Sequence, residues 1–224
     1  MAFSAVEQGV FDFPLSIPPA LEGERPALRA AVRDAQRRIV RFAATYGWAR
    51  LVEEPFATEA RIFDRKADFD RDAIALTGSE PATLLPKTFS AGLERGVLIA
   101  VSPALYAANF PEGARDPAGY EKLLAHEIAH RLHVRILDGH EDDMGPIWFF
   151  EGFAVYAAGQ WAEDAWDPEP ELLDSVLRSS RRGSYRDYGK VFRFFARRVP
   201  LRDLIGQAAK PRFAEWARAT AELP

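Results

Sequence analysis

Apolar and polar positions follow two different rhythms along this chain. In the first half they change from helical spacing to short alternating runs, whereas from residue 120 onward they keep helical spacing almost to the end. Residues 24–46 place Leu28 and Ile39 on one face with arginines on the other, which predicts an amphipathic helix that stops at Gly47. Residues 1–23 contain three prolines. They are expected to form an irregular arm or a short edge strand.

The region after this helix predicts a small β-sheet and one more helix. Residues 59–64 alternate apolar and charged side chains as a half-buried strand does, and residues 65–76 return to helical spacing before Gly78. Short β-prone runs follow, separated by Pro86 and by a glycine-containing turn at 92–96. These runs are residues 83–85, 88–91 and 96–102.

The second half of the chain predicts helices alone. Residues 103–119 contain proline and glycine and are expected to be irregular. The expected helices span residues 120–137, 147–161, 172–179, 188–198 and 202–221. The chain is therefore predicted to be a single α+β domain. A small mixed N-terminal lobe, about 1–138, packs its short sheet on the helix 120–137, and an all-helical C-terminal lobe, about 139–224, follows.

Composition narrows the class of protein. With 224 residues and a hydrophobic share of 48%, the chain is long enough to bury a core, and its longest apolar runs are too short to cross a bilayer. The formal net charge of -4 provides no broad basic surface, so neither nucleic acid nor a membrane is expected as a partner. The N-terminal residues lack the features of a secretory signal, which favours the cytoplasm. A local basic cluster is interpreted as a solvated helix end rather than a ligand patch. It comprises Arg178, Arg181, Arg182 and Arg186.

One stretch of the predicted helix 120–137 carries chemistry. His126 and His130 are four residues apart and therefore share one face of a helix, with Glu127 beside them. Two imidazoles directed at one point are half of a zinc site, and the neighbouring carboxylate is placed to act as a general base. Because the chain has no cysteine, a further ligand must be histidine, aspartate or glutamate.

Three residues are candidates for the third ligand. His133 rotates partly off the ligand face and is interpreted as a helix-surface histidine. His140 lies in an acidic loop and is interpreted as solvated. Glu151 lies on the next predicted helix among large apolar residues, where an unpaired carboxylate is costly, so it is favoured as the ligand.

The two predicted helices together resemble a known class of enzymes. Residues 124–130 read Leu-Ala-His-Glu-Ile-Ala-His, and residues 146–156 read Pro-Ile-Trp-Phe-Phe-Glu-Gly-Phe-Ala-Val-Tyr. They are similar to the two signature helices of gluzincin-type zinc metallopeptidases, and among these of the peptidase-MA-like family. The resemblance implies a zincin-like fold and one zinc ion held by His126, His130 and Glu151. It also implies hydrolysis of peptide bonds, with Glu127 as general base and acid.

The resemblance further implies a tyrosine hydroxyl that stabilises the oxyanion. Counting back from Arg193, Tyr185 occupies the family position, and Tyr188 is the alternative. Two residues depart from the family pattern. Phe150 stands where a polar residue is common, and Val155 stands where some gluzincins carry an aspartate that supports the ligands.

Several alternatives stay open at this level. A peptide or protein substrate is implied, and an endopeptidase is slightly favoured because no motif for binding a free amine is present. The rivals are a catalytically inert zinc domain that binds peptides or serves as a scaffold, and a zinc hydrolase of a non-peptide amide or ester. An aspzincin-like site with Asp187 as ligand matches the local pattern poorly. Residues 97–101 are expected either to align a substrate at a sheet edge or, being apolar on both faces, to form a buried central strand.

Overall fold

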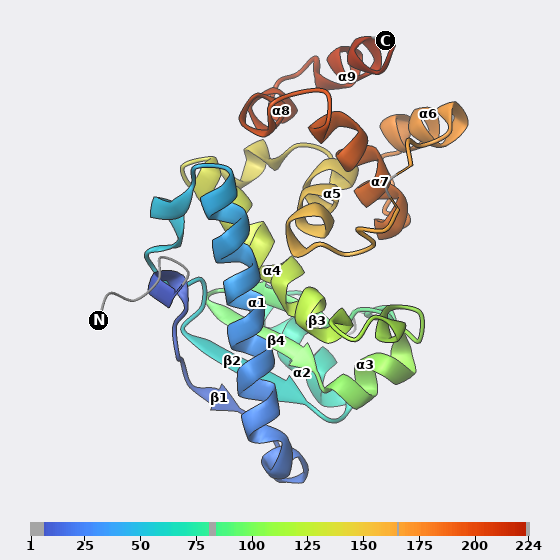
Figure 1. The fold of residues 1–224 in the computed structure, drawn as a ribbon. Helices are drawn as coiled ribbons and strands as arrows, with labels where there is room; N and C mark the ends of the chain where they lie inside the picture. Colours follow the sequence, from blue (N-terminus) through green and yellow to red (C-terminus); the bar gives the residue numbers. More distant parts are fainter. Residues whose placement is uncertain (1–6, 81–83, 165, 223–224) are drawn as a thin grey trace.

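A four-stranded sheet and the helices that cover it form the lower part of the molecule in Figure 1. The computed structural model describes residues 7–80, 84–164 and 166–222. The strands are β1 (Leu15–Ser16), β2 (Glu59–Phe63), β3 (Ala91–Glu94) and β4 (Val97–Val101), in the spatial order β1-β2-β4-β3.

Strand β4 lies between β2 and β3 in the sheet. It pairs with β2 in parallel and with β3 in antiparallel register. The β3–β4 hairpin turns at Arg95 and Gly96, whose φ angles of 50° and 79° suit the twist of a two-residue hairpin turn. Of the two roles expected for residues 97–101, the buried central strand is therefore the one observed. Within the described residues, β3 forms the edge beside it.

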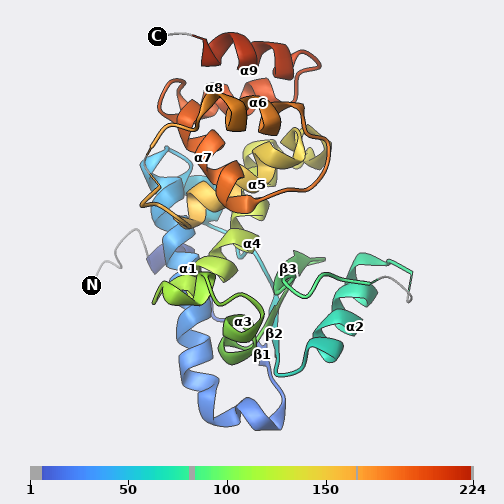
Figure 2. The ribbon, with the colours of Figure 1, turned by 90° about the vertical axis from the view of Figure 1, so that its right-hand side faces the viewer.

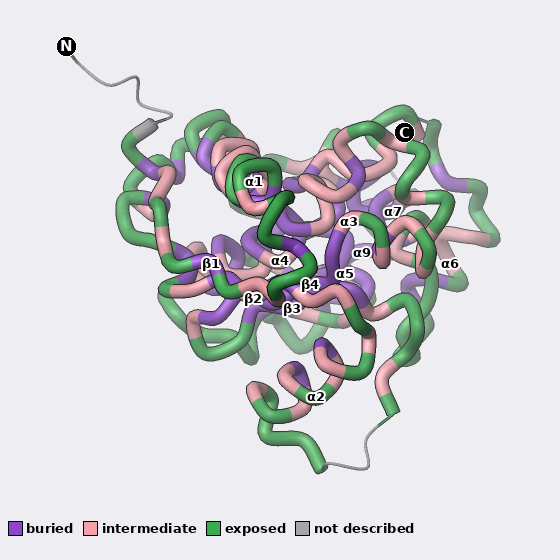
Figure 3. The backbone as a smooth tube through the Cα atoms, turned by 90° about the horizontal axis from the view of Figure 1, so that it is seen from below, coloured by how far each residue is buried: buried purple, intermediate pink, exposed green. Residues whose placement is uncertain are grey.

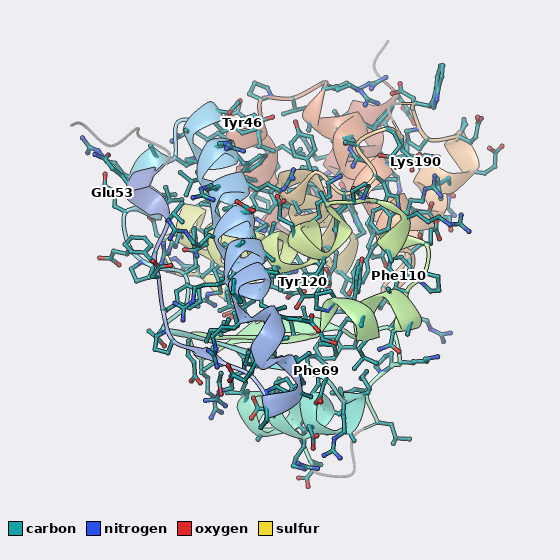
Figure 4. The ribbon with its side chains drawn as sticks, turned by 60° about the horizontal axis from the view of Figure 1, so that its bottom comes forward. Tyr46, Glu53, Phe69, Phe110, Tyr120 and Lys190 are labelled. Carbon is teal, nitrogen blue, oxygen red and sulfur yellow. The ribbon has the colours of Figure 1, made fainter. Side chains whose placement is uncertain are left out.

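Side chains of β4 alternate between two hydrophobic clusters, as the period of a strand requires. Leu98 and Ala100 face the helices α1 (Arg25–Thr45) and α4 (Gly119–Ile136). Val97, Ile99 and Val101 face the cluster that contains Phe69 of α2 and Tyr106 of α3. Helix α2 spans Lys66–Thr77 and α3 spans Pro103–Asn109. Figure 2 shows α1 and α2 on opposite sides of the sheet, and Figure 4 shows Phe69 between α2 and the strands.

The remaining helices gather at the other end of the molecule (Figures 1 and 2). They are α5 (Ile147–Ala158), α6 (Pro170–Arg178), α7 (Tyr185–Ala196), α8 (Leu201–Ala208) and α9 (Phe213–Ala221). Short 3-10 helices span Glu7–Gly9, Pro19–Glu24, Ala49–Val52, Gly113–Arg115 and Glu141–Met144. The most buried backbone lies around α4, α5 and β4 (Figure 3). In the described part of the chain, no helix is both long and apolar enough to span a membrane.

Two glycines allow α5 and α7 to approach closely. A Cβ atom on Gly152 would lie 2.8 Å from the carbonyl oxygen of Tyr188, and one on Gly189 would lie 2.4 Å from Cγ1 of Val155. Side chains larger than hydrogen at these two positions would force the helices apart. The close approach is what brings the first turn of α7 next to Glu151.

The structure confirms a mixed α+β architecture with a small sheet. Three predictions about helices need correction. Residues 103–119 contain α3, which Ser102 caps by accepting a hydrogen bond from the backbone N–H of Leu105. The predicted helix 202–221 is two helices, because Pro211 lacks the backbone donor that a continuous helix needs. Helix α7 also begins three residues earlier than predicted, where Ser184 caps it.

The strand predictions before β4 also need correction. Of the run 83–85, Thr83 lies outside the described residues, and Leu84 and Leu85 belong to no strand. The predicted strand 88–91 overlaps β3 only at Ala91, and the predicted turn at 92–96 is mostly strand. Gly92, which is predicted to lie in the turn, is instead buried inside β3 opposite Ile99.

Candidate metal centre and its cleft

Helices α4 and α5 bring the three predicted ligands together. His126 and His130 lie one turn apart on α4, and Glu151 faces them from α5. Glu151 is buried, with 3% of its surface exposed, and its carboxylate faces both imidazoles. Burial of a charged group in such surroundings is costly unless partners compensate for it, and here both imidazoles do.

The three donor atoms have the separations of a small metal site. Nε2 of His126 lies 3.1 Å from Nε2 of His130 and 3.0 Å from Oε2 of Glu151, and the third separation is 3.4 Å. Ligands at about 2.0 to 2.2 Å from a tetrahedral zinc ion lie about 3.3 Å apart. The three atoms therefore fit one face of such a tetrahedron, and the group can hold a metal ion.

The electrostatics of these groups favour a charged Glu151. Burial opposes ionisation of its carboxyl, but hydrogen bonds from His126 and His130 outweigh burial and hold the pKa below its ordinary value. For His126, burial opposes the charged form, and the neighbouring carboxylates of Glu151 and Glu127 reverse that effect and raise the pKa. Because the carboxylates of Glu151 and Glu127 favour positive charge beside them, the space between these groups and the imidazoles is suited to a cation.

Glu127 lies beside the ligands and lines the cleft over them. Burial raises the pKa of its carboxyl above the ordinary value, and the charges of His126 and His130 counteract part of this effect. A raised pKa is the direction that a general base working near neutral pH requires. Glu127 is thus close to the predicted ligands without being one of them.

Gln160 supports His126 from behind. Its side-chain oxygen lies 3.0 Å from Nδ1 of His126, so Nε2 is left to face the ligand cluster. Of the two residues that depart from the gluzincin pattern, Val155 is fully buried, and the ring of Phe150 lies 5.9 Å from the ring of His130. Gln160 is not among the site residues predicted from the sequence. The signal for it is a polar residue just after Gly159, the glycine that ends α5.

The structure separates the two candidate tyrosines. The hydroxyl of Tyr185 lies 3.3 Å from Oε1 of Glu151 and lines the cleft. Tyr188 points elsewhere: its buried hydroxyl bonds with the backbone N–H of Gly183 and the carbonyl oxygen of Arg181. Tyr185 is therefore brought to the site, and Tyr188 holds the loop before α7.

Arg182 is a second residue of the site that was not predicted from the sequence. Its Nη1 lies 3.0 Å from Oε1 of Glu151 and donates a hydrogen bond to the hydroxyl of Tyr185. The interpretation of the basic cluster as solvated holds for Arg178, which pairs with Asp174 on the surface. Arg182 is exposed as well, but it also pairs with the buried Glu151. The direction of a loop side chain depends on the packing of α7 against α5, which periodicity does not encode.

The other candidate ligands lie away from the site. His140 is exposed, and its Nδ1 is 2.9 Å from the carbonyl oxygen of Leu137. Asp187 lies in the first turn of α7 and is not one of the three residues whose donor atoms converge. His133 is no ligand, but its predicted surface position is wrong: it is fully buried between Phe149 and Phe153, because α5 packs over that side of α4.

A cleft of about 1060 Å³ opens over the ligands. Strand β3 forms one wall of it, and the loop and first turn of α7, including Arg182 and Tyr185, form another. His126, Glu127 and His130 line it between these walls. The cleft is large enough to take a short stretch of extended polypeptide.

Comparisons with known proteins add no further constraint. No protein-family model matches the chain, and neither the curated proteins nor the solved structures contain a significant match. The function is therefore inferred from the residues and geometry of the site alone.

Proposed function

We propose that this protein is a zinc-dependent peptidase in which His126, His130 and Glu151 hold one zinc ion. The observation that carries the proposal is the convergence of these three donor atoms beside Glu127 on the floor of an open cleft. The cleft offers an approach for a substrate to the ligands, which a purely structural metal site does not need. When bound, zinc supplies Lewis acidity, which polarises a carbonyl group and acidifies water.

The protein's own residues supply the remaining chemistry. Glu127 takes a proton from the attacking water and passes it to the departing amine. Tyr185 donates a hydrogen bond from its hydroxyl group to the oxyanion that develops on the attacked carbonyl group. Gln160 keeps the ring of His126 in the orientation that directs Nε2 at the ligand cluster.

The edge of the sheet provides a place for the substrate backbone. Residues 91–94 of β3 pair with β4 on one side and line the cleft on the other. An extended peptide can add to such an edge through main-chain hydrogen bonds. This role belongs to β3, since β4 is paired on both sides.

The proposal is tested with Glu127→Gln, which keeps the size of the side chain and removes its basicity. We expect the variant to bind zinc as wild type does and to cleave peptides about 10²- to 10⁴-fold more slowly. Glu171→Gln, a matched change on the exposed face of α6, is the control. Zinc content is measured by metal analysis, and cleavage of a peptide library is followed with and without a chelator.

Two outcomes would contradict the proposal. A zinc-loaded Glu127→Gln protein that cleaves as fast as wild type would remove Glu127 from the mechanism. Zinc bound at His126, His130 and Glu151 with no peptide cleavage by wild type would favour a domain that binds peptides without cutting them.

A further inference from the structure

Side-chain contacts join the α7 wall of the cleft to the segments that follow α3 and α5, and we call this bridged part the closed end. Arg186 of α7 lies 3.1 Å from a carboxylate oxygen of Glu112 and 2.6 Å from one of Asp164. Beside this bridge, the ring of Phe110 meets the ring of Trp161 edge-on, with 6.3 Å between the ring centres. Phe110 directly follows α3 (Figure 4), and all of these residues except Asp164 line the cleft. A peptide that continued between Arg186 and Glu112 would have to break this ion pair.

Arg182, four residues before Arg186 in the chain, is a further cation that lines the cleft. Its side chain is 58% exposed, and Glu151 is its carboxylate partner among the described residues. Arg186, by contrast, is neutralised by two carboxylates. Oε2 of Glu151 faces the two imidazoles, whereas Oε1 faces Arg182. A metal ion held through Oε2 would draw negative charge from the carboxylate and so weaken its attraction for Arg182. A guanidinium group in that situation is suited to a carboxylate, which it binds through charge-assisted hydrogen bonds.

The direction of β3 relates this end to the direction of a bound peptide. Ala91, the first residue of β3, pairs with Ala100, and β4 then leads through Ser102 into α3 and the closed end. A peptide antiparallel to β3 therefore points its C-terminus toward the closed end. Antiparallel pairing is the slightly more stable arrangement.

The charges at the other end of β3 agree with this direction. Glu94, the last residue of β3, lines the cleft with Glu141 and Asp142, and one guanidinium, that of Arg131, accompanies these three carboxylates. The excess negative charge suits the amino-terminal part of a peptide.

We infer that the cleft binds the free carboxyl terminus of a peptide through Arg182, so that the enzyme removes residues from the C-terminal end of its substrates. The inference rests on the proposed peptidase function and replaces the endopeptidase expectation. The bridge between Glu112 and Arg186 limits how far the substrate extends past the site, and Arg182 selects the terminus that lies there.

The first test uses a random hexapeptide library in three forms: both termini free, N-terminus acetylated, and C-terminus amidated. Products of the zinc-loaded protein are identified by mass spectrometry. We expect residues to be lost from the C-terminal end of the first two forms, and cleavage of the amidated form to be about tenfold slower. Equal cleavage of the amidated form overturns the inference, as does loss of residues from the N-terminal end.

The second test measures binding without turnover, so that failure of catalysis and failure of carboxylate recognition are distinguished. Immobilised, zinc-loaded Glu127→Gln protein should retain the free form about tenfold better than the amidated form. Adding Arg182→Gln should reduce that preference to about twofold, while Arg178→Gln, a surface arginine of α6, should leave it unchanged. Zinc content is verified for each variant.

The outcomes of the binding test are separate from those of catalysis. Retention of the free form by the Glu127→Gln protein without cleavage by wild type contradicts the peptidase and supports carboxylate recognition. Equal retention of the two forms, no retention of either, or an unchanged preference in the Arg182→Gln protein overturns the inference.

Discussion

The side-chain oxygen of Gln160 lies 3.0 Å from Nδ1 of His126. The position of Gln160 is itself fixed, because the guanidinium of Arg193 on α7 donates a hydrogen bond to the backbone carbonyl oxygen of Gln160. Residues of α4, of the turn after α5 and of α7 thus determine the orientation of the His126 imidazole. An amide is a neutral acceptor, so it orients the ring without adding a negative charge near the ligands.

We expect Gln160→Ala to lower the affinity for zinc by about 10- to 100-fold, because His126 loses the partner of its Nδ1–H group. Affinity is measured by competition with a chromogenic chelator. Gln160→Glu restores an acceptor and should recover the affinity. Gln207→Ala on α8, outside the cleft, is the matched control. Equal affinities for the wild type and Gln160→Ala would show that the contact does not support the site.

Removal of one hydroxyl tests the assignment of the two tyrosines. Tyr185→Phe should lower kcat by about 10²- to 10³-fold with little change in zinc affinity, because the donor to the oxyanion is lost. Tyr188→Phe should instead lower the free energy of unfolding by about 1 kcal/mol, since its hydroxyl bonds with two backbone groups of the preceding loop. Steady-state kinetics and urea unfolding measure the two effects. An unchanged kcat in Tyr185→Phe would remove Tyr185 from the mechanism.

The packing of α5 on α7 gives a prediction about Gly152. Gly152→Ala should lower the free energy of unfolding by about 1 to 3 kcal/mol, because the added methyl group meets the backbone of Tyr188. Gly206, on α8, faces open space, so Gly206→Ala should raise stability by about 0.5 to 1 kcal/mol. Urea unfolding measures the free energy of unfolding of both variants. Equal changes in the two variants would contradict the close approach of α5 and α7 at Gly152.

His133 makes the protein sensitive to acid. Among the described residues, neither of its ring nitrogens has a hydrogen-bond partner, and burial lowers its pKa to about 3. Below about pH 6.5 the unfolded chain binds a proton at this histidine, whereas the folded protein does not. This contribution to stability is therefore present above that pH and is lost progressively as the pH falls toward 3.

His133→Phe removes that pH dependence and keeps an aromatic ring between Phe149 and Phe153. We expect wild type to lose about 2 kcal/mol more stability than the variant between pH 8 and pH 5. Urea unfolding at both pH values, with a chelator present, measures the difference and keeps the metal out of the comparison. Parallel losses in the two proteins would indicate that His133 finds a partner that stabilises its charged form.

The local pattern of the chain was sufficient for most helices and for the ligand cluster. Apolar spacing placed α1, α2 and α4 to within two residues, because the contacts that make an amphipathic helix lie three and four positions apart. The same spacing put His126 and His130 on one face. Glu151 followed from the cost of burying a carboxylate among aromatic side chains.

Contacts between residues distant in the sequence decided the rest. The order of the strands made β3 the edge, although the apolar run of β4 was the stronger β pattern. The close packing of α5 and α7 selected Tyr185 over Tyr188, buried His133, and turned Arg182 toward Glu151. Periodicity in the sequence determines which face of an element is apolar. Which element covers that face, and where the side chains of a connecting loop point, depends on the whole tertiary packing.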